Sequence, residues 1–483
     1  MLRYLGNDRL TQILAGVAVV AVVYLLTMGS VNMALMLAAG ALFMAAFHYG
    51  RLSLGSSVLV LWLGGFAAMA ILSLLRAATG EDSPPVMLVG FFVLAFAGAW
   101  SGRWRAGPLL FALGIFAFYA AVVGLSSWFG RSTPTALVYQ ALYDVRVLLL
   151  LLVAGAFAQQ YRMLVTRIDK LALVLLLLLL PFVLVQSVLP DLYSIVFPFG
   201  DGAANPFLPF LPARAKGFFV HSSVLAQFAV FFVFWNAIQI WFRGERSAQS
   251  MLVLLGYIVV LVLSGQRQET MAACAALALL WVFAPGGRLW PRLTTAVLVL
   301  AAGLAAALAV AGGDAIYALA REWGLVANAW VWEPRAVMYQ FGIKLANEYW
   351  PLGSGAGTFG SVGAAKFDQR LYFELGFMRF FWFVEGKWLM DTYWPHIFAE
   401  GGWIGLGLMC WFFVYLAWRA GRALRATSDP VLQSLFAMAL AGMLFNLLNS
   451  PTSAAISDIN YMWPYLPFVG LPFCRWSERE PAR

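Results

Sequence analysis

The feature that most constrains this chain is a long series of apolar runs joined by short polar connections. A helix needs about 20 apolar residues to cross the hydrocarbon of a bilayer. We therefore predict an all-α, polytopic transmembrane helical bundle of 12–14 spans, forming a single integral membrane domain over residues 1–483. The candidate spans lie near 11–28, 31–48, 55–75, 85–101, 107–124, 145–161, 170–189, 217–242, 250–264, 269–284, 293–311, 397–418, 430–448 and 459–474.

Composition excludes the other broad classes. The chain is 63% hydrophobic and 11% charged, whereas an ordinary soluble domain carries about 25% charged residues. Strand-type alternation is absent, which argues against a barrel. The net charge of +9 is explained by arginines beside the spans, so no nucleic-acid partner is predicted. The three cysteines form no C-x-x-C pair, so we expect neither a disulfide framework nor a zinc site.

Basic residues divide unequally between the two sides of the predicted bundle. With the N-terminus inside, eighteen lysines and arginines fall on the cytoplasmic side. The short loops on the other side hold only six, namely Arg76, Arg131, Arg146, Arg214, Lys216 and Arg267. By the positive-inside rule, both termini are predicted in the cytoplasm, and in a bacterium the opposite face is periplasmic.

One break between spans, residues 312–395, is far longer than the others and is predicted to be a large periplasmic loop. It contains the glycine-rich stretch 351–360 and many aromatic residues, and its acids and bases nearly cancel. This composition favours short helices lying on the bilayer surface. Residues 335–350 are predicted to form an amphipathic helix that ends at the glycine-rich turn. Function tends to be located in loops held by a rigid scaffold.

Four cations on this face are candidates for binding an anion. Arg267 lies at the external end of a span, and Arg335 opens the loop helix. Arg214 and Lys216 precede another span. A guanidinium can hold phosphate oxygens bidentately. The plainer interpretations are that Arg267 snorkels or pairs with Glu269, that Arg335 forms a surface salt bridge, and that the other two set topology.

Two residues just before the span near 397–418 are candidate bases, Asp391 and His396. A carboxylate or an imidazole at the membrane surface can take a proton from a sugar hydroxyl. Glu400 lies inside that span, where an acid indicates function by default, although it also suits a tie between helices. The sequence contains no P-loop, no hydrolase nucleophile motif and no metal motif, so no metal and no cofactor is predicted.

The order of these motifs resembles the O-antigen ligase and O-antigen polymerase superfamily of bacterial envelope glycosyltransferases. The resemblance covers roughly residues 210–410. It rests on the segment 214–226 entering a span, Ser264–Arg267 ending the next, Arg335 opening a segment that leads into Pro351–Phe359, and the Ala399–Gly405 turn.

The resemblance implies a GT-C-like membrane fold in the bacterial inner membrane and an inverting, metal-independent transfer. The implied partners are an undecaprenyl-diphosphate-linked glycan donor, a glycan or lipid A-core acceptor, and membrane lipid. Arg267 and Arg335 match the residues that would hold the diphosphate, with Arg214 or Lys216 assisting. Preorganised cations of this kind stabilise developing charge.

The chain departs from the family pattern at the base. Family members commonly place His-Asn or Asp-Asn about nine residues before the glutamate of the Ala-Glu-Gly turn. Here that position holds Asp391, and His396 comes five residues later. Asp391 is therefore the first candidate for the base and His396 the second, which favours a polymerase over a ligase acting on lipid A.

Two functions of other classes are alternatives. One is a transporter or flippase for lipid-linked or anionic substrates, which would need polar residues near the midplane and often uses repeats or broken helices. The predicted span centres carry few charges, and no two-fold repeat is evident. The other is a structural or sensor membrane protein, for which the sequence offers no positive sign.

Overall fold

The computed structural model describes residues 86–196, 205–285 and 333–476, apart from a few isolated positions, and scattered residues within 58–69 and 291–320. The predicted spans near 11–28 and 31–48 lie outside the described residues, as do the first part of the loop 312–395 and most of the spans near 55–75 and 293–311. The described chain is all helical, and a single β-bridge joins Trp104 and Cys474.

Six helices in the described part of the chain are long and apolar enough to cross a membrane, which confirms the predicted polytopic helical bundle. They are α5 (Ala106–Phe129), α6 (Pro134–Phe157), α7 (Tyr161–Val188), α9 (Ser222–Ile238) with its π-helical extension (Gln239–Arg243), α18 (Trp394–Ala426) and α19 (Pro430–Asn449). Shorter apolar helices are α4 (Val86–Trp100) and α10 (Ala248–Leu263), and the less apolar α11 (Arg267–Phe283) follows α10.

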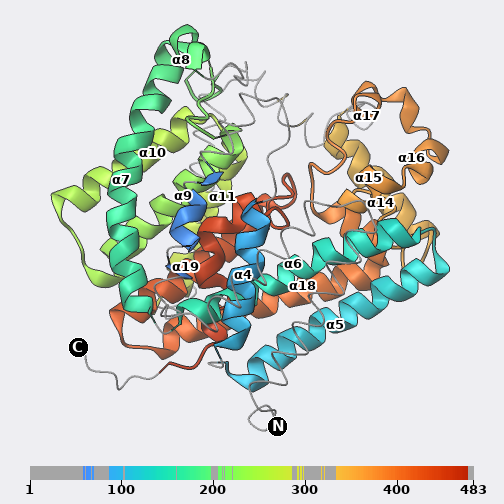
Figure 1. Cartoon of the computed structure of the whole chain (residues 1–483), viewed down its shortest axis with the longest axis horizontal. Helices are drawn as coiled ribbons and strands as arrows, with labels where there is room; N and C mark the ends of the chain where they lie inside the picture. Colours follow the sequence, from blue (N-terminus) through green and yellow to red (C-terminus); the bar gives the residue numbers. More distant parts are fainter. Residues whose placement is uncertain are drawn as a thin grey trace.

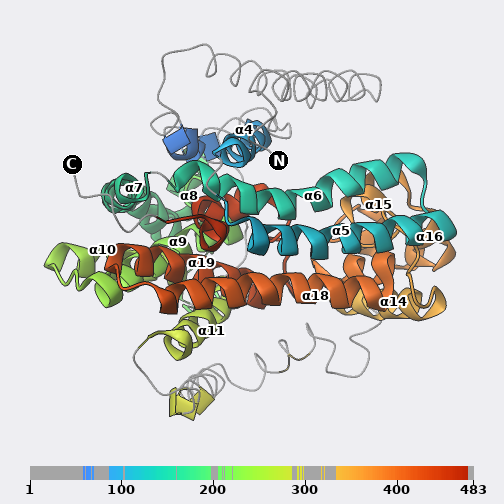
Figure 2. The same cartoon turned by 90° about the horizontal axis from the view of Figure 1, so that it is seen from below.

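The described helices form two groups that are connected by α19. In one, α5, α6 and α18 run side by side, with α4 against α6 (Figures 1 and 2). In the other, α9 packs against α10, and α11 packs against α19. Helix α19 also packs on α18, so it connects the two groups. Figure 1 shows α7 and α8 (Pro190–Val196) at the edge of the second group.

The second half of the long loop folds onto the end of the first group. It comprises α14 (Pro334–Glu348), α15 (Val362–Phe367), α16 (Arg370–Glu374) and α17 (Phe381–Val384). Helix α14 coincides with the predicted amphipathic helix and packs on α18, whereas α15 packs on α6. Several loop aromatics, including Phe359, Tyr372 and Trp382, are fully buried in a small core of their own. These rings therefore stabilise the fold of the loop itself.

Helix α18 is broken near its start. Gly402 has φ 65° and ψ −170°, so the backbone leaves the helical conformation there. A Cβ at Gly402 would lie 2.2 Å from the Pro351 carbonyl oxygen, so only glycine fits. The carbonyls that the break releases accept backbone hydrogen bonds from the glycine-rich stretch: Ser354 N to Ala399 O (2.7 Å) and Gly355 N to Glu400 O (3.1 Å).

The structure corrects two of the predicted spans. Helix α6 begins at Pro134, whereas the apolar run suggested a span from 145. Proline suits the first position of a helix. Helices α5 and α15 pack on α6 and cover its polar outer half. The segment 459–474 is not one helix. It contains α20 (Ile459–Met462), α21 (Leu466–Val469) and 3-10 turns at Trp463–Tyr465 and Leu471–Phe473, because proline lacks the N–H that a continuous helix needs.

Two contacts near the ends of helices bear on the predicted alternation of spans between the two faces. Arg162, the second residue of α7, pairs with Asp429, the residue before α19, at 3.4 Å. On the other face, Ala215 N donates to Leu263 O at 2.9 Å. Each of these two contacts joins segments that the predicted alternation of spans places on the same face.

Candidate functional site

The N-termini of several helices meet on the face that carries the long loop. Gln266, before α11, donates from Nε2 to the Ser222 hydroxyl at the start of α9 at 2.6 Å. Arg335, in the first turn of α14, contacts Asp391, three residues before α18, through Nε and Oδ2 at 2.7 Å. A helix N-terminus carries partial positive charge and free N–H groups. This convergence therefore creates a region suited to binding an anion.

Glu269 lies at the centre of this region. It is in the first turn of α11 and only 3% exposed. Its carboxylate is within electrostatic range of the guanidinium groups of Arg335 and Arg214 and of the Asp391 carboxylate. Its Oε2 makes no hydrogen bond within the described residues. The structure thus gathers three of the six predicted site residues around an acid that the sequence suggested only as a neighbour of Arg267.

The other predicted cations lie along the same edge. Arg267 is the first residue of α11. The Arg214 side chain passes over Gly265, where a Cβ would lie 2.9 Å from Arg214 Cγ. Lys216 is 5% exposed, and its backbone N–H donates to Gln186 Oε1 at 2.7 Å. The segment 214–217 is therefore fixed between the end of α7 and the α10–α11 turn, which brings Arg214 beside the start of α11.

A cavity of about 530 Å³ opens beside the Arg335–Asp391 pair, between α14, α18 and the turn 451–452. Its lining is almost entirely apolar and includes one charged residue, Arg335. The remaining lining residues are Ala336, Tyr339, Ile343, Trp394, Phe398, Trp403, Leu406, Cys410, Pro451 and Thr452.

The polar tips of the lining side chains are bonded to the protein. Tyr339 OH donates to Pro451 O at 3.0 Å, and Trp394 Nε1 donates to the Ser450 hydroxyl at 2.7 Å. Trp403 Nε1 donates to Asn347 Oδ1 at 2.9 Å. The rings consequently present apolar faces to the cavity. The cavity fits a hydrocarbon chain whose anionic head lies at Arg335, and it offers few partners for sugar hydroxyls.

The two candidate bases occupy different surroundings. The Asp391 side chain is 34% exposed and is held by Arg335, the side chain at the cavity. His396 is 6% exposed, its ring packs edge-on against Tyr393 at 4.9 Å, and its backbone lies against Gly360. Asp391 is therefore placed to reach a ligand at Arg335, whereas His396 belongs to the interior of the protein.

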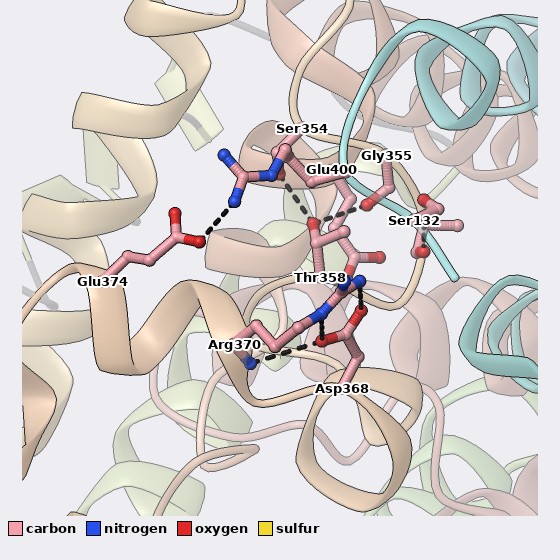
Figure 3. A network of polar contacts seen from close by, with 10 residues as sticks. Ser132, Ser354, Gly355, Thr358, Asp368, Arg370, Glu374 and Glu400 are labelled. Atoms are coloured by element: carbon pink, nitrogen blue, oxygen red, sulfur yellow. Dashed lines mark hydrogen bonds and ion pairs between the residues drawn. The ribbon is translucent and has the colours of Figure 1, made fainter.

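Glu400 is tied to the glycine-rich stretch. Its Oε1 accepts from the backbone N–H groups of Thr358 (2.9 Å) and Phe359 (3.0 Å) and from the Ser361 hydroxyl (2.6 Å). The hydroxyls of Ser354 and Thr358 form a further bond at 2.7 Å within the same network (Figure 3). All of these groups are buried. The arrangement explains Glu400 as the residue that fixes the loop in the break of α18.

Sequence reasoning missed a chain of polar groups beside the cations. His221 Nδ1 contacts the Ser223 hydroxyl at 2.7 Å, and that hydroxyl contacts Tyr461 OH at 2.7 Å. Tyr461 is within electrostatic range of both Glu269 and Asp391. His221 lies within the segment 214–226, on which the resemblance partly rests. Tyr461 lies 238 residues from Ser223, and no local pattern marked it.

No protein-family model matches the chain, and no curated protein matches its sequence. The sequence and the structure together establish a helical, multi-pass membrane protein with six candidate spans in its described part. A polar, cation-rich region beside an apolar cavity is the feature from which its function can be argued.

Proposed function

We propose that the protein is a glycosyltransferase that transfers or polymerises glycan from an undecaprenyl-diphosphate-linked donor. The observation that carries this proposal is the position of the Arg335–Asp391 pair, 2.7 Å apart, at an apolar cavity of about 530 Å³. An amphiphile with an anionic head and a long hydrocarbon tail matches this arrangement, because the head can bind Arg335 and the tail can fill the apolar cavity. The motif order described above, which resembles the O-antigen polymerases and ligases, supports the same class of substrate.

Binding of the donor and activation of the base are coupled in this proposal. The diphosphate oxygens bind the guanidinium of Arg335 in place of the Asp391 carboxylate, because a guanidinium binds phosphate bidentately. Arg214 and Arg267 assist in binding the diphosphate. The Asp391 carboxylate is then released from its ion pair and is free to act as a base. Preorganised cations stabilise the charge that develops on the leaving diphosphate.

The transfer is a single inverting displacement. An acceptor hydroxyl gives its proton to Asp391 while its oxygen forms a bond to the anomeric carbon. The bond between that carbon and the diphosphate oxygen breaks, and the electron pair leaves with undecaprenyl diphosphate. The acceptor is a growing glycan or a lipid A-core, and Asp391 at the family's base position favours the polymerase.

The orientation belongs to the same proposal. The excess of arginine on one set of loops places both termini in the cytoplasm. The cations and the cavity then face the periplasm of the bacterial inner membrane, where lipid-linked glycans are available.

A reconstituted assay tests the activity. The protein in liposomes receives a defined lipid-linked oligosaccharide, and mass analysis detects new glycosidic bonds. Arg335→Ala is expected to lower the rate about 10²–10³-fold, the usual effect of removing one preorganised donor, and Arg267→Ala to abolish polymer formation. Arg370→Ala, in the same loop but paired with Asp368, is the control and keeps wild-type activity. Normal product from Arg335→Ala and Arg267→Ala refutes the assignment.

One observation favours the alternative of a transporter or flippase. Helix α18 is discontinuous at Gly402, and broken helices form the substrate sites of many transporters. Here, however, the carbonyls at the break are already bonded by the glycine-rich stretch. The same liposomes separate the two functions, since a carrier moves the lipid-linked substrate across the bilayer without changing its mass.

A further inference from the structure

Arg146 occupies an unusual place in the bundle. It lies at the middle of α6, where the polar outer half, with Tyr139, Gln140 and Tyr143, meets the apolar run that begins at Val147. Sequence counting placed it in an external loop, but the structure places it inside a helix that is a candidate membrane span. A guanidinium at such a position is costly unless it has a partner.

Within the described residues, few groups contact the Arg146 guanidinium. The Arg146 guanidinium lies over the Tyr143 ring, 3.7 Å from its centroid. Its Nε is buried and has no hydrogen-bond partner within the described residues. No ion pair of Arg146 is formed in that part of the chain. Tyr143 therefore contacts the guanidinium, but the Arg146 Nε–H has no acceptor among the described residues.

The described helices that pack on α6 provide no counter-ion either. The helices described as packing against α6 are α4, α5, α15 and α21, and none of them contains an acidic residue. Asp144, the neighbouring acid on α6, accepts instead from Gln140 at 2.7 Å and from Tyr119 on α5 at 3.4 Å.

Asp458 is a described carboxylate within electrostatic range of Arg146, and it has another role. Its Oδ1 accepts from the Asn460 N–H at 2.8 Å and caps α20. Burial raises the pKa of Asp458, and this effect exceeds the lowering by Arg146. Asp458 in turn lies within electrostatic range of Tyr461, which senses Glu269 and Asp391. Arg146 is therefore electrostatically linked to the candidate site through the start of α20.

We propose that Arg146 binds an oxyanion of the ligand, a phosphate or a carboxylate group, and so extends the cation-rich site to α6. The fork of a guanidinium suits two oxygens of one such group, and the Tyr143 ring contacts this guanidinium at 3.7 Å. The inference rests on the proposed function and adds a residue to its site. The oxyanion has two sources, the diphosphate of the lipid-linked donor or the carboxylate of an acidic sugar in the glycan.

Thermal unfolding of the purified full-length protein in detergent tests this assignment, because a ligand that binds the folded state raises the melting temperature. The probes are inorganic pyrophosphate, undecaprenyl diphosphate, an oligogalacturonate and a neutral oligosaccharide at constant ionic strength. We expect an oxyanion probe to stabilise the wild type. In Arg146→Gln, we expect its apparent Kd to rise about tenfold or more, as for the loss of one charge-assisted hydrogen bond.

The matched control is Arg162→Gln. Arg162 also lies over a tyrosine ring, that of Tyr161, but it pairs with Asp429 on the other face, and its variant keeps the wild-type response. Stabilisation by the two diphosphates identifies the donor as the source, and stabilisation by oligogalacturonate alone identifies the acidic sugar. An unchanged response of Arg146→Gln to every probe, or no response of the wild type to any, overturns the inference.

A measurement without ligand separates binding from a structural role. If Arg146 holds a ligand, Arg146→Gln melts at or above the wild-type temperature, since it removes a charge that has no ion pair within the described residues. A lower melting temperature, equalled by Asp458→Asn, shows a structural ion pair and overturns the inference. Wild-type protein that binds an oxyanion through Arg146 but forms no glycosidic bond leaves this site standing and rejects only the transferase.

Discussion

Replacement of Glu400 by alanine provides the sharpest test of the architecture around the glycine-rich stretch. Three donors, Thr358 N, Phe359 N and the Ser361 hydroxyl, lie 2.9, 3.0 and 2.6 Å from Glu400 Oε1. The side chain is 3% exposed, so water does not replace it easily. The hydroxyl can turn to another acceptor, but the two backbone N–H groups cannot.

The expected loss in the free energy of unfolding follows from those two backbone N–H groups. A buried donor left without an acceptor costs about 1–3 kcal/mol, so Glu400→Ala is expected to lower the free energy of unfolding by about 2–6 kcal/mol. Glu400→Gln retains a carbonyl oxygen as acceptor, and its loss is expected to be about half as large. Both variants loosen the loop that fills the break at Gly402.

Denaturant unfolding of the purified protein in detergent measures these differences. Glu348→Ala is the matched control. Glu348 is an exposed glutamate of α14 that contacts Lys344 at 3.6 Å, and exposed pairs contribute about 0–1 kcal/mol. If Glu400→Ala unfolds at the same denaturant concentration as Glu348→Ala, the hydrogen bonds to the loop do not stabilise the fold and the reasoning is wrong.

Two further predictions concern the cavity and the loop. Cys410 lines the cavity and is exposed, so a lipid-linked diphosphate is expected to slow its reaction with a maleimide. Cys274 is exposed elsewhere and serves as the control, which reacts at an unchanged rate. Equal rates at Cys410 with and without the lipid contradict the proposed position of the hydrocarbon tail. Arg370 lowers the pKa of Asp368 below 3.8 through a hydrogen bond, so Asp368 stabilises the folded state above that pH and loses this contribution as the pH falls through its folded pKa. The stability difference between the wild type and Asp368→Asn, measured by thermal unfolding, should therefore be constant above about pH 5 and shrink below 3.8; a difference that grows on acidification contradicts the ion pair.

The apolar runs of the sequence located most of the helices well. The runs near 85–101, 250–264 and 430–448 correspond to α4, α10 and α19 within one or two residues. This agreement has a simple reason. In lipid, each backbone polar group must be bonded within its own segment, so a sufficiently long apolar run has one stable conformation, and its length sets the helix.

Where polar contacts compete with hydropathy, the sequence was a poorer guide. Helix α6 extends eleven residues before the predicted start because other helices cover its polar half. The segment 459–474 is apolar throughout, but prolines divide it and neighbouring helices bury it. Prolines are visible in a sequence, yet whether nearby helices accommodate them depends on packing.

The candidate site shows the same division. Residue types identified Arg214, Arg267 and Arg335 as groups suited to binding phosphate. They identified Asp391 as a group suited to accepting a proton. The contact between Arg335 and Asp391 joins residues 56 positions apart, and no local rule specifies it. The long-range position of Glu269 and the polar tips turned away from the cavity likewise follow from tertiary packing.

By itself the sequence determined a helical, multi-pass membrane protein, because burial of apolar surface and bonding of the backbone act locally along the chain. Only the tertiary structure decided which cations share a site, that Glu400 fixes a loop, and that Arg146 lies inside a helix. Those outcomes depend on distances between helices, and such distances are set by how side chains from distant segments pack together.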